Sequence, residues 1–414
     1  MKNFLLFCFC LIAPLDLYGE GAVSLGIDQL QLPRYSPLLR NKKIGVLTNQ
    51  TGKDSSLQPS YKIIAKLAEA SGGKLSALFA PEHGLHGDEY AERALFDGMT
   101  DEKIPIHSLY GKTTKPTADM LKGITLLIYD IQDIGTRSYT YATTLFYLME
   151  ASALHNIPLL VLDRPNPING VTVDGPLLDK DQRSFVGYID VPYCHGMTIG
   201  ELALFFNAEY QIGCKLQVIP MAGWKREMSY SDTGCHWVPT SPQIPESTTA
   251  LYYPMTGLIG QLSLASIGIG YTLPFKVVGA PWILADPFCE QLNKQNFAGV
   301  HFVPFHFIPF HGKYAKEKCH GALIVITDPL QYKPVAIQFL LIGMIKTLYP
   351  SDFQQLLPKE NSKIEAFQHA CGTAKVYDIL REKKSVVWPL MELYQKRLNN
   401  FLQKRKKYLL PDYS

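Results

Sequence analysis

Short apolar runs alternate with helix-like segments through the first half of the chain. The apolar runs occupy residues 43–48, 74–79, 121–129 and 158–162. Between them, residues 61–70 and 143–155 carry apolar side chains at helical spacing. Strands that alternate with helices imply parallel pairing, and runs this apolar are typical of strands covered on both faces. The pattern predicts an α/β fold built on a Rossmann-like, mostly parallel, doubly wound sheet.

The hydrophobic pattern changes character near residue 245. Residues 237–245 are rich in proline and serine, residues 257–270 are rich in glycine, and residues 297–310 are aromatic and studded with proline. A strand-like run at 321–327 and a helix-like segment at 334–348 follow, and a long basic helix closes the chain. We therefore expect a Rossmann-like catalytic domain over residues 23–245 and a smaller α+β domain over residues 246–414.

The first 22 residues have the pattern of an export signal. Lys2 supplies a charged start, and residues 4–14 form an apolar core that is too short to span a bilayer. Small residues at 19–22 fit a cleavage site. The sequence predicts a signal peptide over residues 1–22, a periplasmic or extracellular location, and no stable membrane insertion.

Composition narrows the class of protein. The chain has 414 residues, 47% of them hydrophobic and 19% charged, which is typical of a globular protein of about two domains. A net charge of +3 gives no reason to expect nucleic acid as a partner. Six cysteines follow the signal, at wide spacings without a CxxC pair. That spacing argues against a zinc ribbon and leaves free thiols and one or two disulfides both open.

Polar and ionisable side chains follow each of the four apolar runs. The carboxyl ends of parallel strands meet at one edge of a sheet, so these side chains should gather there. Carboxylates, amides and tyrosines without a nucleophilic serine suit a sugar, because carboxylates supply the acid and base for glycosidic cleavage. The segment LFAPEHGLHG at 78–87 places Glu82, a candidate proton donor, beside two histidines. The gathered residues are Asn49, Glu82, His83, Asp130, Gln132, Asp133, Arg137, Tyr139, Tyr141, Asp163, Arg164 and Asn166.

Each of these residues also has a purely structural interpretation. The alternatives are a turn cap for Glu82, Asx turns for Asp130 or Asp133, an ion pair between Asp163 and Arg164, a hydrogen-bonded buried ring for His195, and core or wall positions for the tyrosines. Their joint placement after strands is what favours a site.

The chain lacks the common cofactor motifs. The turn after the first strand reads TNQTG rather than GxGxxG, which argues against an NAD-dependent oxidoreductase. Neither a phosphate-binding GxxxxGK[ST] nor a serine-hydrolase GxSxG occurs. The HxxH at 83 and 86 lies in a glycine-flanked turn, so its rings need not face one metal. We predict no cofactor and no metal.

Several long blocks resemble one known family, the NamZ-type exo-β-N-acetylmuramidases. The blocks are PEHGLHG, SLYG at 108–111, YDIQDIGTRSYTY, LDRPNPING, DGPLLD, SFVG, HGMTIGELA, WVPTSPQIP and the closing RKKYLL. The resemblance implies a cleft between the two domains and hydrolysis of a non-reducing terminal N-acetylmuramic acid from peptidoglycan fragments. It also implies that Glu82 is the general acid. Its other motif residues match Asp130, Gln132, Asp133, Arg137, Tyr139 and Tyr141.

The second domain departs from the family pattern. Relatives usually read close to EGTNxSEGRGT where this chain reads QLSLASIGIGY at 261–271. A glutamate is thereby replaced by Gln261 and an arginine by Ile269, and the usual SPN reads Ser241-Pro242-Gln243. Loss of an arginine removes a partner for the lactyl carboxylate of muramic acid, at a cost of about 1.5–3 kcal/mol in binding.

Two functions therefore remain. The leading one is an exported glycoside hydrolase that releases N-acetylmuramic acid or a close variant from peptidoglycan-derived muramyl sugars. The alternative is a catalytically weakened or inactive cell-wall sugar-binding protein on the same fold. The candidate catalytic residues are Glu82, Asp130 and Asp133. The candidate substrate-binding residues are Asn49, His83, Gln132, Arg137, Tyr139, Tyr141, Asp163, Arg164, Asn166, His195, Ser241 and Gln261.

Overall fold

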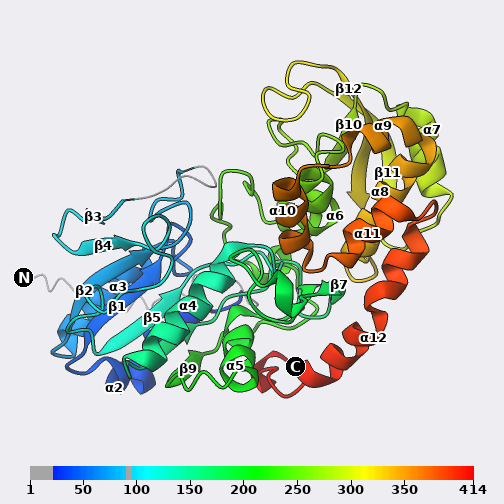
Figure 1. Cartoon of the computed structure of the whole chain (residues 1–414). Coiled ribbons are helices and arrows are strands. Elements are labelled where there is room, and N and C mark those ends of the chain that lie inside the picture. The colour runs from blue at the N-terminus through cyan, green and yellow to red at the C-terminus, as the bar shows by residue number, and fades with distance from the viewer. Residues whose placement is uncertain (1–21, 90–95) are drawn as a thin grey trace, which may run out of the picture.

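The computed structural model describes residues 22–89 and 96–414. The predicted signal peptide falls almost wholly on residues 1–21, outside the described residues. Figure 1 shows a larger part built on a sheet and a smaller part that carries the second sheet and most of the later helices.

A seven-stranded sheet forms the centre of the first domain. Its strand order is β3-β4-β2-β1-β5-β6-β9, and every pair is parallel except the edge pair β3–β4. The chain runs outward from β1 in both directions, so the order reverses between β1 and β5. The α/β class and the mostly parallel sheet are confirmed. The strands are β1 Lys43–Thr48, β2 Lys74–Ala80, β3 Gly98–Met99, β4 Pro105–Ser108, β5 Leu126–Asp130, β6 Leu159–Leu162 and β9 Leu216–Ile219.

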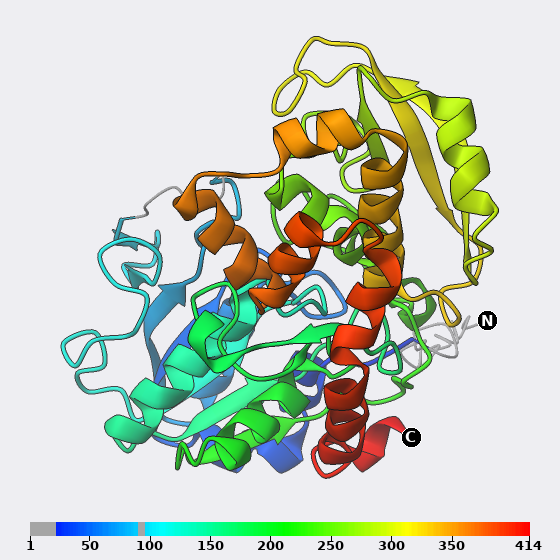
Figure 2. The same ribbon diagram turned by 45° about the vertical axis from the view of Figure 1, so that its right-hand side comes forward.

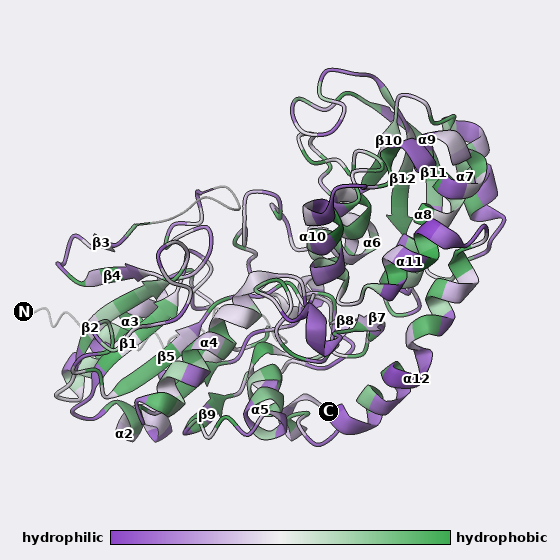
Figure 3. Cartoon of the chain, viewed as in Figure 1, coloured by the Kyte–Doolittle hydropathy of each residue, from purple (hydrophilic) through white to green (hydrophobic). Residues whose placement is uncertain are grey.

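Helices cover both faces of this sheet. One face packs against α1 (Gly26–Leu30) and α3 (Ser60–Ala70), with α2 (Ser36–Leu39) near its edge. The other face packs against α4 (Thr140–Leu154) and α5 (Ile199–Glu209) in a core that continues into the second domain. Burial on both faces explains why the strands are so apolar, as Figure 3 shows for β1, β2 and β5.

The second domain combines a three-stranded antiparallel sheet with a set of helices. The sheet order is β10-β12-β11, and α8 is its buried central helix. A two-stranded ribbon, β7 (Asp174–Leu177) with β8 (Pro192–Cys194), lies between β6 and β9 in the chain, and its strand β7 contacts α8 and α12 of the second domain. The elements are α6 Thr249–Gln261, β10 Val277–Ala280, α7 Ala285–Asn293, β11 Val300–Phe307, β12 Cys319–Ile326, α8 Pro334–Leu348, α9 Pro350–Leu356, α10 Asn361–Cys371, α11 Lys375–Glu382 and α12 Val387–Arg405.

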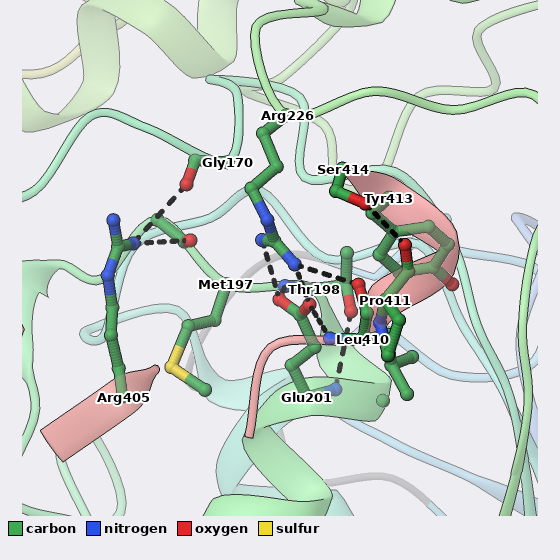
Figure 4. Close-up of polar contacts among 12 residues, drawn as sticks. Gly170, Met197, Thr198, Glu201, Arg226, Arg405, Leu410, Pro411, Tyr413 and Ser414 are labelled. Atoms are coloured by element: carbon green, nitrogen blue, oxygen red, sulfur yellow. Dashed lines mark hydrogen bonds and ion pairs between the residues drawn. The ribbon is translucent and has the colours of Figure 1, made fainter. Parts of the chain in front are cut away.

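The last helix returns the chain to the first domain. Figures 1 and 2 both show α12 descending from the second domain until the C-terminus lies near α5. There Glu201 pairs with Arg226 and accepts the backbone N–H of Leu410 at 2.8 Å (Figure 4). Tyr413 donates its hydroxyl to the buried carboxylate of Asp163 at 2.6 Å. The C-terminal segment is thus bonded to the loops that follow the sheet.

Two further features of the described residues concern the cysteines and the long apolar helices. All six cysteines after the signal are free thiols, which settles the open choice against disulfides in the described residues. Within the described ranges, no single helix is long and apolar enough to cross a membrane. The bent pair α8–α9 meets that test only when its two helices are taken together, by length and composition, and most of α8 is buried in the core.

Candidate active site

A cavity of about 630 Å³ lies between the two domains. The first domain contributes the turn after β2, the start of α4 and the loop before β8. The second contributes α6, the segment after it and the loop between β11 and β12. The residues used below are Glu82, His83, Tyr110, Tyr139, Thr140, Phe185, Tyr193, Ser241, Tyr253, Gln261, Ile267, Ile269 and Lys313.

Glu82 reaches the cavity from the turn that follows β2. Its side chain is buried, and Oε2 accepts the hydroxyl of Thr140 at 2.6 Å. Thr140 is the first residue of α4, where the unpaired N–H groups of a helix favour a negative charge. The turn closes through left-handed backbone at His83 (φ 70°) and Gly84 (φ 78°). These contacts fix one carboxyl group at the cavity wall.

Tyrosines form the wall beside this carboxyl group. Tyr139 donates to Thr240 Oγ1 at 2.9 Å, and Tyr141 donates to the Thr240 carbonyl at 2.5 Å. The rings of Tyr139 and Tyr253 meet edge to face at 6.2 Å. Burial raises the pKa of the Tyr139 and Tyr253 hydroxyls above their usual range, so both are neutral. The first domain therefore presents rigid, uncharged aromatic surface next to Glu82.

The crevice at the reversal of strand order is filled by the protein itself. Arg164 binds both carboxylate oxygens of Asp130, at 2.7 and 2.9 Å. The N–H of Gln132 donates to Thr51 Oγ1 at 2.9 Å, and that hydroxyl donates to Asn49 at 2.6 Å. Only about 10 Å³ of space remains beside these residues. The loops after β1, β5 and β6 thus bind one another where a doubly wound sheet commonly binds its ligand.

Asp133 is buried behind the cavity wall. Its Oδ2 accepts the N–H of Gly135 at 2.7 Å, and its Oδ1 has no partner among the described residues. Burial is the largest influence and raises the pKa of this carboxyl to about 7.

Arg137 connects the two domains rather than lining the cavity. Its Nη2 donates at 2.7 Å to the carbonyl of Cys371, the last residue of α10. Nε and Nη1 find no partner in the described chain, and burial lowers the guanidinium pKa. The negative end of the α10 dipole faces this buried charge and favours it.

Three other predicted residues hold loops in place. Asp163 accepts Thr198, Gly200 and Tyr413 as donors, and burial raises its pKa to about 6. Asn166 accepts the N–H of Ile168 and donates to the Met197 carbonyl. The buried His195 ring accepts the Met197 N–H, and burial lowers its pKa to about 3, so the ring is neutral.

The structure thus divides the predicted residues into two groups. Glu82, His83, Tyr139, Ser241 and Gln261 line the cavity, and Tyr141 packs against Tyr139 and His83. The others lie off the described lining: Asn49, Asp130, Gln132, Asp133, Arg137, Asp163, Arg164, Asn166 and His195.

Sequence reasoning missed several lining residues. Thr140 lies inside the block GTRSYTY, and its position just before the helix predicted at 143–155 was the only available signal. Tyr110 lies in the block SLYG at 108–111, to which the sequence analysis gave no role in the site. Tyr253 and Lys313 lie outside all the blocks that carry the family resemblance.

The divergent segment 261–271 forms part of the cavity wall. Gln261 ends α6, Leu264 is buried in the core, and Ile267 and Ile269 line the cavity. This wall is therefore apolar where the family resemblance led us to expect charged residues. Within residues 22–89 and 96–414, no group of three or more His, Cys, Asp or Glu side chains is arranged to hold a metal ion.

A two-domain α/β protein with a carboxyl group at a strand end, facing an aromatic cavity between its domains, has the features of a glycoside hydrolase. Sequence models described as exo-β-N-acetylmuramidase NamZ match residues 44–248 for the N-terminal domain and 251–410 for the C-terminal domain. The chain belongs to this family of hydrolases.

Individual relatives support the same family assignment. The chain is 41% identical over 390 residues to the peptidoglycan β-N-acetylmuramidase NamZ of Bacillus subtilis, covering 94% of this chain and 91% of the relative. Two crystal structures of DUF1343 family proteins from Bacteroides fragilis are also similar. One has a TM-score of 0.88 and 37% identity, over 96% of this chain and all of the other. The second has a TM-score of 0.72 and 29% identity, over 95% and 99%.

Proposed function

We propose that this protein is an exported hydrolase that releases N-acetylmuramic acid from the non-reducing end of peptidoglycan fragments. The observation that carries the proposal is the placement of Glu82, a buried carboxyl group held by Thr140 at the wall of the cavity. The 41% identity to a peptidoglycan β-N-acetylmuramidase supports the choice of sugar.

Glu82 serves as the general acid in this proposal. Its protonated carboxyl donates to the oxygen of the departing sugar as the glycosidic bond breaks. A water molecule adds its oxygen to the anomeric carbon of the muramyl sugar, and the proton that this water loses passes to solvent, from which Glu82 is protonated again. The carboxylate left behind is stabilised by the Thr140 hydroxyl and by the N-terminus of α4, which are in place before the reaction begins.

Aromatic side chains provide the surface for the sugar ring. Tyr110, Phe185 and Tyr253 line the cavity together with Tyr139. Flat rings pack against the apolar face of a pyranose, while the Ser241 hydroxyl and the Gln261 amide are available to its hydroxyl groups.

Hydrolysis of a defined disaccharide tests the proposal. The purified chain is incubated with MurNAc-GlcNAc and with a chromogenic muramide, and Glu82→Gln should lower the rate at least about a hundredfold. Glu69→Gln, an exposed glutamate on α3, is the matched control and should leave the rate unchanged. Binding without release by the unmodified chain would favour the sugar-binding alternative, and neither binding nor release would reject both.

Export is proposed from the sequence of residues 1–22. The full chain expressed in a bacterium should be recovered outside the cytoplasm with its N-terminus between residues 19 and 23, as measured by mass spectrometry. An intact Met1 on a cytoplasmic product would contradict this part of the proposal.

A further inference from the structure

N-acetylmuramic acid differs from N-acetylglucosamine by a lactyl ether that ends in a carboxylate. A carboxylate that leaves water for a partly enclosed cavity needs a charged or hydrogen-bonding partner there. If the proposed function holds, the cavity must supply that partner although Ile267 and Ile269 make one wall apolar.

Lys313 is the only lysine or arginine on the described lining of the cavity. Its side chain is half-buried, and no carboxylate of the described residues forms an ion pair with it. The other basic lining residue, His83, already uses Nδ1 in a 2.7 Å contact with the Glu89 carbonyl. A lysine without a carboxylate partner among the described residues therefore lies on the lining of the cavity that the sugar would occupy.

The loop that carries Lys313 is held in position by the neighbouring chain. Phe310 donates its N–H to the Gly270 carbonyl at 2.6 Å. Gly270 has φ +78°, and a Cβ there would lie 2.1 Å from the His311 carbonyl oxygen, so the two segments are in close contact. Next to Lys313, the Tyr314 hydroxyl accepts the indole N–H of Trp282 at 3.0 Å. The loop is thus fixed against the segment that supplies the apolar wall.

The side chain itself has a defined environment. The Lys313 ammonium lies 4.7 Å from the centroid of the Tyr314 ring, which attracts a cation without neutralising its charge. Low polarity on the adjacent wall strengthens an ion pair formed there, because fewer water molecules screen it.

From these contacts we infer that Lys313 binds the lactyl carboxylate of the muramyl substrate and so selects it over the uncharged N-acetylglucosaminyl sugar. The inference rests on the proposed function, since it assigns one residue to the recognition of that sugar. Glu82 would act on the glycosidic bond, whereas Lys313 contributes to binding from the opposite domain.

Kinetics with a charged and an uncharged substrate test the inference. The substrates are a para-nitrophenyl N-acetylmuramide and the same compound with its lactyl carboxylate converted to an amide. Lys313→Gln should raise KM for the acid about ten- to hundredfold with little change in kcat, and should change KM for the amide far less. Lys313→Arg should restore most of the preference. Lys318→Gln, an exposed lysine of the same loop, is the matched control and should behave like the unmodified chain.

A binding measurement separates this inference from the proposed function. In the Glu82→Gln background, titration calorimetry compares free N-acetylmuramic acid with N-acetylglucosamine. The unmodified Lys313 should favour the acid at least about tenfold, and Lys313→Gln should remove that preference. Failure of hydrolysis with this preference intact would reject the enzymatic proposal alone. Equal binding of both sugars, or a preference that survives Lys313→Gln, would overturn the role of Lys313.

Discussion

The bond between Tyr413 and Asp163 should stabilise the fold more strongly at high pH than at low pH. The Tyr413 hydroxyl donates to Asp163 Oδ2 at 2.6 Å and accepts the Met221 N–H at 3.0 Å. Tyr413→Phe removes both bonds and keeps the ring, which packs edge-on against Trp224 at 5.0 Å. The substitution therefore isolates the hydroxyl.

The magnitude follows from the protonation state of Asp163. Burial raises its folded pKa to about 6, whereas the unfolded value is about 3.9. Because the folded protein favours the protonated Asp163 carboxyl, this group contributes stability that is fully present below about pH 3.9 and is lost as the pH rises through about 6. Above that pH the buried carboxylate is charged and depends on its donors. A hydrogen bond to a charged group contributes about 1.5–3 kcal/mol and one to a neutral group about 0.5–1.5 kcal/mol. The unpaired Met221 N–H adds about 1 kcal/mol at either pH.

Urea unfolding followed by tryptophan fluorescence measures the effect. Tyr413→Phe should cost about 2.5–4 kcal/mol near pH 8 and about 1.5–2.5 kcal/mol near pH 5. Tyr408→Phe is the control, because Tyr408 donates to Glu209 at 2.7 Å and the pKa of Glu209 is lowered by that bond. Since Glu209 is ionised at both pH values, the control should show a small loss that does not change between them. Equal losses for Tyr413→Phe at the two pH values would refute the reasoning.

Three other substitutions test the interpretation of particular residues. Asp130→Ala leaves the buried Arg164 without its carboxylate and should cost about 3–5 kcal/mol in urea unfolding; a loss below about 1 kcal/mol would contradict the assigned ion pair. Asp133→Asn removes a buried carboxyl with a folded pKa of about 7. Because this pKa is raised, the contribution of Asp133 to the free energy of unfolding is lost as the pH rises from about 4 to 7. Between pH 5 and 8 the stability of this variant relative to the parent should therefore increase by about 2–3 kcal/mol, since each of the two pH units between 5 and the folded pKa of about 7 contributes about 1.4 kcal/mol, and a constant difference would exclude the raised pKa. Gly270→Ala should lower the melting temperature and raise KM, whereas Gly213→Ala, with a similar φ of +72° but nothing within 4 Å, should cost only about 1 kcal/mol and leave KM unchanged.

Hydrophobic periodicity was a good guide where burial is uniform. The helix predicted at 334–348 is α8, Pro334–Leu348, because nearly all of its side chains are buried. The run at 158–162 became β6 for the same reason. By contrast, β11 at Val300–Phe307 contains Pro304 and buries only Phe302 and Phe307, so it was seen only as an aromatic stretch. The two-residue strand β3 carries too little pattern to be predicted.

The candidate site was harder to predict, because the position of a residue at a strand end does not show which side chains it will contact. Glu82 and Asp130 both follow apolar strands of the same parallel sheet, and both are buried acids. Glu82 meets a hydroxyl at a helix start and the cavity, whereas Asp130 meets Arg164. Whether a strand-end acid meets a cavity or an arginine depends on which other loops lie next to it in the fold. Hydrophobic periodicity along the sequence does not show which loops become neighbours.

This division of the sheet edge also explains how the second domain can vary. The ion pair of Asp130 with Arg164 and the bonds of Gln132 make the centre of the edge a fixed part of the core. The cavity lies to one side, over β2 and the start of α4, where the second domain supplies the opposite wall. Substitutions in 261–271 or in the β11–β12 loop can therefore change what the cavity recognises, because these segments belong to the second domain, whereas the Glu82–Thr140 bond and the Asp130–Arg164 ion pair belong to the first. In the role inferred for it, Lys313 approaches the cavity from the β11–β12 loop, while Glu82 and its bond to Thr140 stay in the first domain.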